Sequence, residues 1–395
     1  MGTGSHRAPD AMRAFPGRSD ATWETPRMGD PVRVAYTMLQ CWHRVPGGTA
    51  SSILSLADAL GDRDDVRLTG VGPWGRSLPA APWTPNIPVE RLPLPYQLLY
   101  DVWHHSPFLS PSWFTGTVDV VHATAATVPP RGKVPLVVTI HDLFPLLAPE
   151  QFTPRGVRIL TRGVEMARRR ADLVCCPSEA TLGDCVAAGF PIDRLRVVPW
   201  GAHRREVTAS DRARVRATYS LDRPYVLWVG TIEPRKNLPT LLEAYRRAEL
   251  FDEELVLVGP IGWHEQLEGH LDGIGDRVRR LGFVPAEDLP ALYAEARLFC
   301  MPSLREGFGL PALEAMAQGT PVIAAAGSAT EEVVGDGGLV VPPTDVAGWA
   351  ETMRTVLTDE ALAERLSHAA RRRAATFSWD RSAELMVAAY REVTT

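Results

Sequence analysis

The chain has 395 residues, of which 45% are hydrophobic and 23% charged, so it is long enough to bury a sizeable core in two or three domains. Its formal net charge of -5 provides no general attraction to nucleic acid or to anionic lipid. Five cysteines without a C-x-x-C pair indicate no disulfide framework and fit a reducing cytoplasm.

Residues 1–30 are rich in Gly, Pro, Arg and Ser and contain no apolar core segment. We therefore expect a disordered N-terminal extension rather than a signal peptide. Apolar runs elsewhere are shorter than the roughly 18 residues that a membrane-spanning helix needs. Membrane contact is therefore expected to be peripheral at most.

In the first half of the chain, short β-branched runs alternate with helical patterns, which is typical of parallel sheets covered by helices. The pattern predicts helices at 49–60 and 96–105. It predicts strands at 32–39, 66–72, 118–123, 134–140 and 172–176. The stretch 72–115 is dense in Pro and Trp, and we expect a long irregular binding loop around its helix.

The alternation pauses near 196–206 and then restarts, which predicts a second α/β half hinged to the first near 200–222. Its predicted strands are 225–230, 255–259, 277–284, 297–302, 320–325 and 338–343. An amphipathic helix is expected at 376–393. Doubly wound sheets bind ligands at the carboxyl ends of their strands, so the cleft between the two halves is the predicted site.

A glycine-rich turn in the second half carries two glutamates, Glu306 and Glu314, eight residues apart. Pro311 suits the first turn of the helix expected to follow. Backbone N–H groups of 307–310 would then face outward at the positive end of the helix dipole, where an anion can bind. We expect both carboxylates to border one cavity. Amides for phosphate and acids for hydroxyl groups suit a sugar nucleotide.

Two other interpretations of this turn stay open. Taken singly, Glu306 could be a solvated loop acid and Glu314 a partner of the helix dipole, worth about 0.3–1 kcal/mol. The letters 307-GFGLPA-312 also satisfy the G-x-G-x-x-A pattern of dinucleotide-binding turns, with Glu332 where a ribose-binding acid would sit. That pattern belongs to the first strand-to-helix turn of a domain, whereas this turn lies several strands in.

The run 303-SLREGFGLPALEAMAQGTPVIAAA-326 resembles the E-x7-E signature of retaining GT-B glycosyltransferases of family GT4. The similarity covers about residues 30–390, and its further segments are 139–152, 195–202, 229–245 and 327–345. The segment 229-VGTIEPRKNLPTLLEAY-245 resembles the subgroup rich in mannosyltransferases.

This resemblance implies the GT-B fold, an α/β architecture of two doubly wound Rossmann-like domains that face an interdomain cleft. We expect four parts: the disordered extension 1–30, an N-terminal acceptor domain 31–205, a C-terminal nucleotide-sugar domain 206–375, and a helix within 376–395 that packs back on the N-terminal domain.

Arg235 and Lys236 follow the predicted strand 225–230 and open the next helix. Fixed cations stabilise the negative charge that develops on a departing nucleoside diphosphate, and arginine can clamp phosphate oxygens in a bidentate fashion. The resemblance also implies that both side chains bind the donor's phosphates. Many relatives carry an arginine directly after the motif's glycine, Gly230, whereas this chain has Thr231. Arg235 could take over that role.

The resemblance adds further donor contacts outside the E-x7-E run, and Gly230 is one of them. Gly47 and Gly48 would present N–H groups to the donor's phosphate, although a tight turn before a helix is the plainer interpretation. His141 would hydrogen-bond the transferred sugar or steady its cationic transition state, without acting as a base. Backbone groups near Val284 would recognise the nucleobase.

Within the E-x7-E run, the resemblance implies that Glu306 binds sugar hydroxyls and that Glu314 binds the ribose. The residues between them that would contact the donor are Gly307, Phe308, Gly309 and Leu310.

The resemblance implies a retaining glycosyltransferase that needs no metal or other cofactor and uses a nucleotide-sugar donor, and its mannosyltransferase-rich subgroup favours GDP-mannose. The acceptor is an unidentified hydroxyl on a glycan, a lipid-linked glycan or a small molecule. A UDP-glucose or UDP-GlcNAc donor is the alternative, and a nucleotide-sugar 2-epimerase or an NAD-dependent oxidoreductase would be alternatives from other classes. We expect no nucleic-acid partner and a cytoplasmic location, with at most peripheral contact at the inner face of the membrane.

Several suggestive patterns carry less weight. Asp62-Arg63-Asp64 spells D-x-D, but it lies in a polar loop. His104-His105 and Cys175-Cys176 lack metal-ligand spacing. The arginines of 155–170 favour a solvated helix face over lipid contact.

Overall fold

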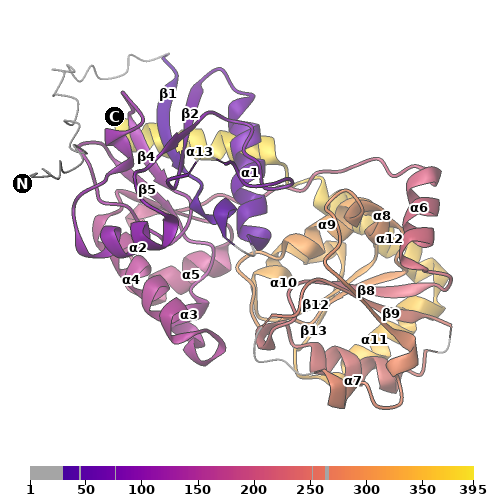
Figure 1. Ribbon diagram of the computed structural model, residues 1–395. Helices are drawn as coiled ribbons and strands as arrows, with labels where there is room; N and C mark the ends of the chain where they lie inside the picture. Colours follow the sequence, from indigo (N-terminus) through magenta and orange to yellow (C-terminus); the bar gives the residue numbers. More distant parts are fainter. Residues whose placement is uncertain (1–29, 44–45, 76, 251, 263–266) are drawn as a thin grey trace, which may run out of the picture.

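The computed structural model describes residues 30–43, 46–75, 77–250, 252–262 and 267–395. The extension predicted at 1–30 falls on residues 1–29, which lie outside this described part. The described residues form two parallel α/β units, one after the other along the chain (Figure 1).

The N-terminal sheet has the strand order β3-β2-β1-β4-β5-β6-β7, and its strand pairs are parallel. Its strands are β1 Val32–Thr37, β2 Val66–Gly72, β3 Val89–Arg91, β4 Val120–Ala123, β5 Leu136–Thr139, β6 Leu173–Cys176 and β7 Leu195–Val197. The α-helices of this unit are α1 Gly47–Gly61, α2 Tyr96–His105, α3 Phe144–Leu147, α4 Pro154–Arg170 and α5 Glu179–Ala187.

The C-terminal sheet has the order β10-β9-β8-β11-β12-β13 and is parallel as well. Its strands are β8 Tyr225–Val229, β9 Glu254–Val258, β10 Val278–Gly282, β11 Leu298–Met301, β12 Val322–Ala325 and β13 Leu339–Val341. The α-helices that follow the N-terminal unit are α6 Ala209–Tyr219, α7 Leu238–Ala248, α8 Leu289–Glu295, α9 Leu310–Gln318, α10 Ala329–Val334, α11 Val346–Thr358, α12 Glu360–Ala374 and α13 Trp379–Thr394.

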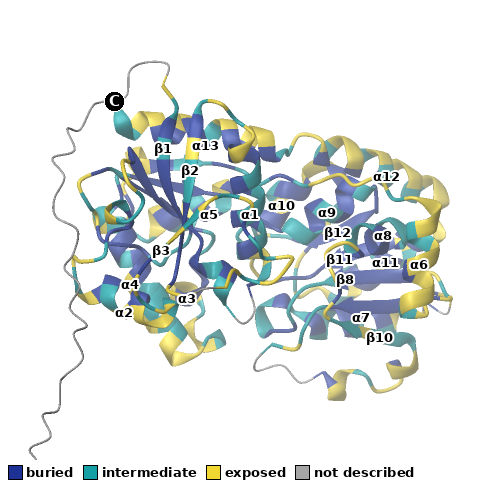
Figure 2. Ribbon diagram, turned by 45° about the horizontal axis from the view of Figure 1, so that its top comes forward, coloured by how far each residue is buried: buried dark blue, intermediate teal, exposed yellow. Residues whose placement is uncertain are grey.

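Central strands of both sheets are buried along their whole length. The strands Leu136–Thr139 and Glu254–Val258 are two examples. They are buried because helices cover both faces of a parallel sheet (Figure 2). The strand order changes direction between β1 and β4 in the first sheet and between β8 and β11 in the second. The predicted doubly wound architecture is confirmed, and these are the switch points beside which such sheets bind ligands.

Every strand predicted from an apolar run is present, but two short strands were not predicted. Val89–Arg91 lies in the stretch 72–115 that was expected to be irregular, and Leu195–Val197 overlaps the pause expected at 196–206. Each has only three residues and includes charged side chains, so neither shows an apolar pattern. Pairing with β2 and β6 creates these strands at the two edges of the sheet.

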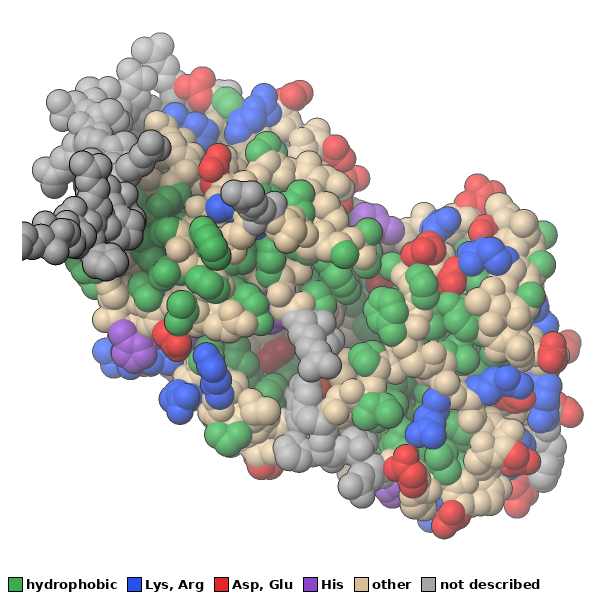
Figure 3. Space-filling model, viewed as in Figure 1, with side chains coloured by type: hydrophobic (Ala, Val, Ile, Leu, Met, Phe, Trp, Pro, Cys, Tyr) green, Lys and Arg blue, Asp and Glu red, His purple; other side chains and the backbone are tan. Residues whose placement is uncertain are grey.

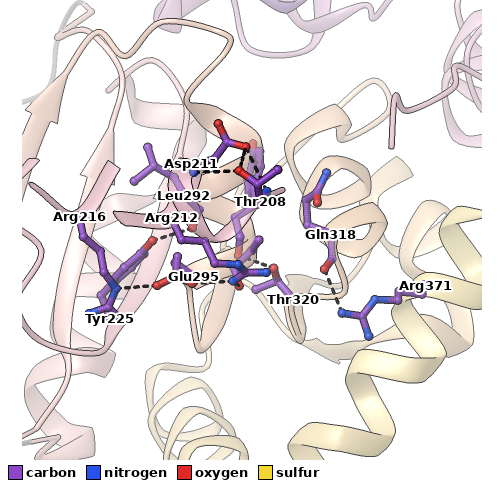
Figure 4. Close-up of polar contacts among 12 residues, drawn as sticks. Thr208, Asp211, Arg212, Arg216, Tyr225, Leu292, Glu295, Gln318, Thr320 and Arg371 are labelled. Atoms are coloured by element: carbon purple, nitrogen blue, oxygen red, sulfur yellow. Dashed lines mark hydrogen bonds and ion pairs between the residues drawn. The ribbon is translucent and has the colours of Figure 1, made fainter. Parts of the chain in front are cut away.

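The chain crosses from the first unit to the second between β7 and α6. Thr208 and Asp211 form a capping box at the start of α6. From this helix, Arg212 and Arg216 hold Glu295 of α8 at 2.5 and 2.6 Å (Figure 4). These ion pairs attach α6 to the C-terminal unit.

The last helix returns to the N-terminal unit. Helix α13 packs along α1 and touches β1 and β4 (Figure 1). The hydroxyl of Tyr390 lies 2.7 Å from Nδ1 of buried His122, whose Nε2 lies 2.8 Å from Oγ1 of Thr139. Within the described part of the chain, no helix is long and apolar enough to cross a membrane.

The Tyr390→Phe variant tests how strongly α13 is anchored. Removing the hydroxyl leaves a buried imidazole nitrogen without its partner, which costs about 1–3 kcal/mol. We expect a lower urea midpoint for the N-terminal unit, with Tyr96→Phe, in a ring cluster with His43 and Tyr100, as the control. Equal midpoints for wild type and Tyr390→Phe would show that this bond contributes nothing.

Candidate active site

The glycine-rich turn leads from β11 into α9, as the sequence predicts. Gly309 immediately precedes the helix with φ +104°, and Gly319 follows it with φ +81°. A side chain at Gly309 would be strained in this conformation and would meet Oγ1 of Thr330 at 2.9 Å. The turn therefore depends on glycine, and the first N–H groups of α9 lie at the positive end of its dipole.

A second turn brings the cations to the same place. Arg235 and Lys236 belong to the 3₁₀ turn Pro234–Lys236, which follows β8 after four residues. The next residue, Asn237, donates from Nδ2 to the carbonyls of Pro302 (3.0 Å) and Pro343 (2.7 Å). The N–H of Leu304 donates to the carbonyl of Arg235 at 2.8 Å. These bonds fix the cationic turn against the chain that leaves β11.

Glu306 lies between the two cations. Its Oε1 is 2.6 Å from Nζ of Lys236 and its Oε2 is 3.1 Å from Nη1 of Arg235. Arg235 also contacts Glu233, with 2.6 Å between Nε and Oε1. The side chains of Lys236 and Glu306 are each only 9% exposed. We call Glu233, Arg235, Lys236 and Glu306 the charge cluster.

Burial and pairing oppose each other in this charge cluster. Burial alone would raise the pKa of Glu306, but Lys236 and Arg235 lower that pKa to about 2. Burial and the neighbouring arginine lower the pKa of Lys236, and Glu306 opposes that shift. Burial raises the pKa of Asp142, which faces the charge cluster from the N-terminal unit. The Glu306 carboxylate is therefore ionised throughout the neutral range.

His141 lies just beyond the end of β5, where the N-terminal unit faces the C-terminal unit. Its Nε2 lies 2.7 Å from the carbonyl of Thr124, so Nε2 carries the proton and Nδ1 is an acceptor. Nδ1 is buried and has no hydrogen-bond partner within the described residues. Burial lowers the pKa of His141 to about 4, so the ring is neutral near pH 7. A ligand hydroxyl would satisfy this acceptor.

The two units touch directly at the glycine-rich turn. A Cβ on Gly307 would overlap the carbonyl oxygen of His141, so only glycine fits there. The carbonyl of Gly307 accepts hydrogen bonds from Ser178 Oγ (2.8 Å) and Thr181 Oγ1 (3.0 Å). These bonds join the turn before α9 to the start of α5.

Glu332 belongs to the same contact between the units. Its carboxylate accepts hydrogen bonds from the backbone N–H groups of Glu179 and Ala180 at the start of α5. Glu332 thus caps a helix of the other unit, which removes the ribose-binding role that the dinucleotide interpretation requires.

A cavity of about 370 Å³ lies between the units beyond this contact. In the space-filling view the two units are separated by a recess (Figure 3). Glu314, Val284 and Leu310 line the cavity from the C-terminal unit, and α1 lines it from the other side. Glu306 and its cations do not line it. This cavity therefore has only one of the two glutamates that were expected to border a single cavity, and Glu306 is paired with the cations.

Glu314 occupies an unusual electrostatic position. Its Oε2 accepts a hydrogen bond of 2.9 Å from the hydroxyl of Tyr293 in α8. Burial raises the pKa of Glu314 to about 7, although that hydrogen bond lowers it. Glu314 therefore changes charge near neutral pH, which no sequence pattern indicated.

Four of the residues predicted to contact the donor have more specific surroundings. The side chain of Phe308 is buried between Trp200 and Phe377, at ring distances of 5.3 and 5.8 Å, so only its backbone can face a ligand. Gly230 lies against Lys236, whose Cε a Cβ there would meet at 3.5 Å. The glycines at 47 and 48 form the first turn of α1, the first of them with φ +65°.

Sequence reasoning missed several partners of these residues. No sequence motif contains these partners, which lie in helices or near strand ends. They are Ser178, Thr181, Trp200 and Tyr293. Only the three-dimensional arrangement shows their role. Within the described ranges, no group of three His, Cys, Asp or Glu side chains could hold a metal ion.

Two parallel α/β units that contact each other at the carboxyl ends of their strands, with cations and acids at that contact, are the arrangement of the GT-B fold. A family model for glycosyl transferases group 1 matches residues 211–373, and a model for glycosyltransferase family 4 matches residues 46–205. The chain belongs to this family and is a glycosyltransferase, as the resemblance implied.

Individual relatives agree with this assignment. O-antigen chain mannosyltransferase B of Escherichia coli is 34% identical over 265 residues, which cover 65% of this chain and 70% of that protein. A D-inositol 3-phosphate glycosyltransferase of Salinispora arenicola is 35% identical over 292 residues, covering 66% of this chain and 64% of its own length. Among solved structures, Anabaena HepE in complex with UDP and glucose has a TM-score of 0.69 at 20% identity, covering 90% of this chain and 98% of that one.

The raised pKa of Glu314 leads to a pH-dependent prediction. Between about pH 4.5 and 7 the folded protein retains a proton that the unfolded chain has released, so Glu314 makes the fold less stable as pH rises through this window. Glu314→Gln removes that loss. We expect the difference in unfolding midpoint, variant minus wild type, to increase from below pH 4.5 to above pH 7.

Glu287→Gln is the control for this measurement. Glu287 is exposed in the loop that follows Val284, so its replacement should leave the pH dependence of the unfolding midpoint unchanged. A midpoint difference for Glu314→Gln that does not change with pH would contradict the raised pKa.

Proposed function

We propose that the chain moves a mannosyl group from GDP-mannose to a hydroxyl acceptor with retention of the anomeric configuration. The observation that carries this proposal is the buried charge cluster directly before the N-terminus of α9. The Escherichia coli relative, a mannosyltransferase by name, supports mannose as the transferred sugar.

The cations have donors left for a diphosphate. Lys236 carries three N–H donors, and one of them is used on Glu306. Arg235 offers its planar fork of donors next to it, 5.4 Å above the ring of Phe144. With the first N–H groups of α9, these side chains would hold the phosphates and stabilise the charge on the departing group. Glu306 keeps both cations in position.

The acceptor groups suit the hydroxyl-rich ends of the donor. Glu306 stays ionised and retains lone pairs for hydroxyls of the transferred sugar. His141 would accept a further sugar hydroxyl at Nδ1. Glu314 would accept from the ribose, and backbone groups near Val284 would contact the base. Binding of the ribose would strengthen as pH rises through about 7, because the carboxylate form is the better acceptor.

The proposed transfer takes place on one face of the sugar. The bond from the anomeric carbon to the diphosphate oxygen breaks, and the acceptor oxygen forms a bond to that carbon on the same face. The acceptor's proton passes to the departing phosphate oxygen, so the scheme requires no protein base. In this scheme Lys236 and Arg235 neutralise the diphosphate. Closure of the cleft would exclude water that could hydrolyse the donor.

Replacing Lys236 tests the proposal. We expect wild type to consume GDP-mannose in preference to UDP-glucose and UDP-GlcNAc, measured as release of the nucleoside diphosphate. Lys236→Ala should lower kcat by roughly 10²–10³, the effect of losing one preorganised donor to a developing anion. Lys133→Ala, which alters the chain's other lysine at an exposed position, is the matched control.

The Glu306→Gln variant distinguishes a catalytic role of Glu306 from a purely structural one. Its turnover per folded molecule should fall even where its unfolding midpoint allows full folding at the assay temperature. Near wild-type turnover in folded Lys236→Ala, or a Glu306→Gln protein that melts early yet retains full activity per folded molecule, would contradict the proposed roles.

A further inference from the structure

One wall of the interdomain cavity is not used by the proposed function. Ser51, Ser55 and Asp58 of α1 line the cavity from the N-terminal unit. Their spacing of four and three residues puts them on one face of the helix. Phe283 and Glu314 line the cavity from the C-terminal unit. Asp58 and Glu314 are the two carboxylates among the described lining residues.

The carboxylate of Asp58 is held but not neutralised. Its Oδ1 accepts a hydrogen bond of 3.1 Å from Nδ2 of Asn86. The nearby charge that favours its ionised form is that of His203, which also lines the cavity, and the influences on its pKa include no arginine or lysine. Burial raises the pKa of Asp58, and nearby Asp62 raises it further. An acceptor with spare capacity therefore faces the cavity.

The position of Asp58 along α1 matches the length of a nucleoside diphosphate. Gly47 and Gly48, the proposed phosphate contacts, begin the helix, and Asp58 lies ten residues beyond Gly48. At a rise of 1.5 Å per residue this separation is about 15 Å, comparable to an extended nucleoside diphosphate from its terminal phosphate to its base. A donor whose phosphates lie at the start of α1 would present its base near Asp58.

Two aromatic side chains flank the same region. Trp83 and Phe283 line the cavity from opposite units, and Phe283 is 64% exposed. Such an exposed ring costs solvation unless a flat partner covers it, and a nucleobase is such a partner. The cavity therefore offers aromatic surface as well as a carboxylate to a planar base with polar edges.

Among the nucleobases, guanine fits a carboxylate best. Guanine presents two adjacent donors, N1–H and the N2 amino group, and a carboxylate offers two adjacent acceptors. Uracil presents a single N–H between two carbonyl oxygens, and adenine presents an acceptor at N1. Both would leave a carboxylate lone pair unmatched or facing another acceptor.

We propose that Asp58 reads the donor's base, its carboxylate accepting hydrogen bonds from N1–H and the N2 amino group of guanine, so that α1 selects a guanosine diphosphate sugar. This inference rests on the proposed function, because it requires a nucleoside diphosphate that is held by the cations and extends its base into this cavity. Asp58 sets specificity and takes no part in the transfer step.

Calorimetric titration with GDP, IDP, XDP and UDP tests the inference without any acceptor. Wild type is expected to bind IDP, which lacks the 2-amino group, about tenfold to a hundredfold more weakly than GDP, the value of one hydrogen bond to a charged group. Asp58→Asn should weaken GDP by at least as much and strengthen XDP, because xanthine carries a carbonyl at C2 that the new amide can donate to. UDP binding should be unchanged.

Asp58→Asn is isosteric, and its amide oxygen can still accept from Asn86, so the fold should be retained. Asp64→Asn, at an exposed position in the loop after α1, is the matched control and should leave all four affinities unchanged. If Asp58→Asn binds GDP and XDP as wild type does, the inference is overturned while a GDP donor stands. If wild type binds UDP more tightly than GDP, the donor in the proposed function fails, and the inference fails with it.

Discussion

The ion pairs around Glu306 are the interaction on which the site depends. A carboxylate with so little exposure is stable only because Lys236 and Arg235 lie within 3.1 Å of its oxygens. Removing one partner from a buried pair leaves an uncompensated charge, which is strongly destabilising. The same pairs keep two cations fixed beside the start of α9. The protein therefore holds positive charge ready in a site from which water is largely excluded, where electrostatic stabilisation is strongest.

The second constraint is the direct contact between the units. Gly307 lies against the carbonyl of His141, and hydroxyls from the start of α5 bind the Gly307 carbonyl. Through this contact the N-terminal unit supplies the neutral acceptor of His141 next to the charge cluster. Helix α13 returns to the first sheet, so the end of the chain also ties the two units together. The site is thus a product of both sheets, with neither sufficient by itself.

Much of the fold and of the site could be predicted from the sequence, because local residue patterns correspond to these features. Apolar runs predict the central strands, and the spacing of glycine, proline and acids predicts the turn before α9. No pattern predicts the strand at 89–91, because sheet pairing and not its own residues creates it. The pairing of Lys236 with Glu306 and the bond from Tyr293 to Glu314 join residues far apart in the sequence, and one sequence contains no signal for such pairs. The motif that contains Phe308 likewise gave no sign that its side chain would be buried.

A crystal structure of the protein with bound GDP would show directly whether Lys236 and Arg235 hold the diphosphate beside the first N–H groups of α9. We expect phosphate oxygens within hydrogen-bond distance of Nζ of Lys236 and of the Arg235 guanidinium, with the ribose near Glu314. A diphosphate bound elsewhere, with the ion pairs of Glu306 unchanged and away from the nucleotide, would contradict this expectation.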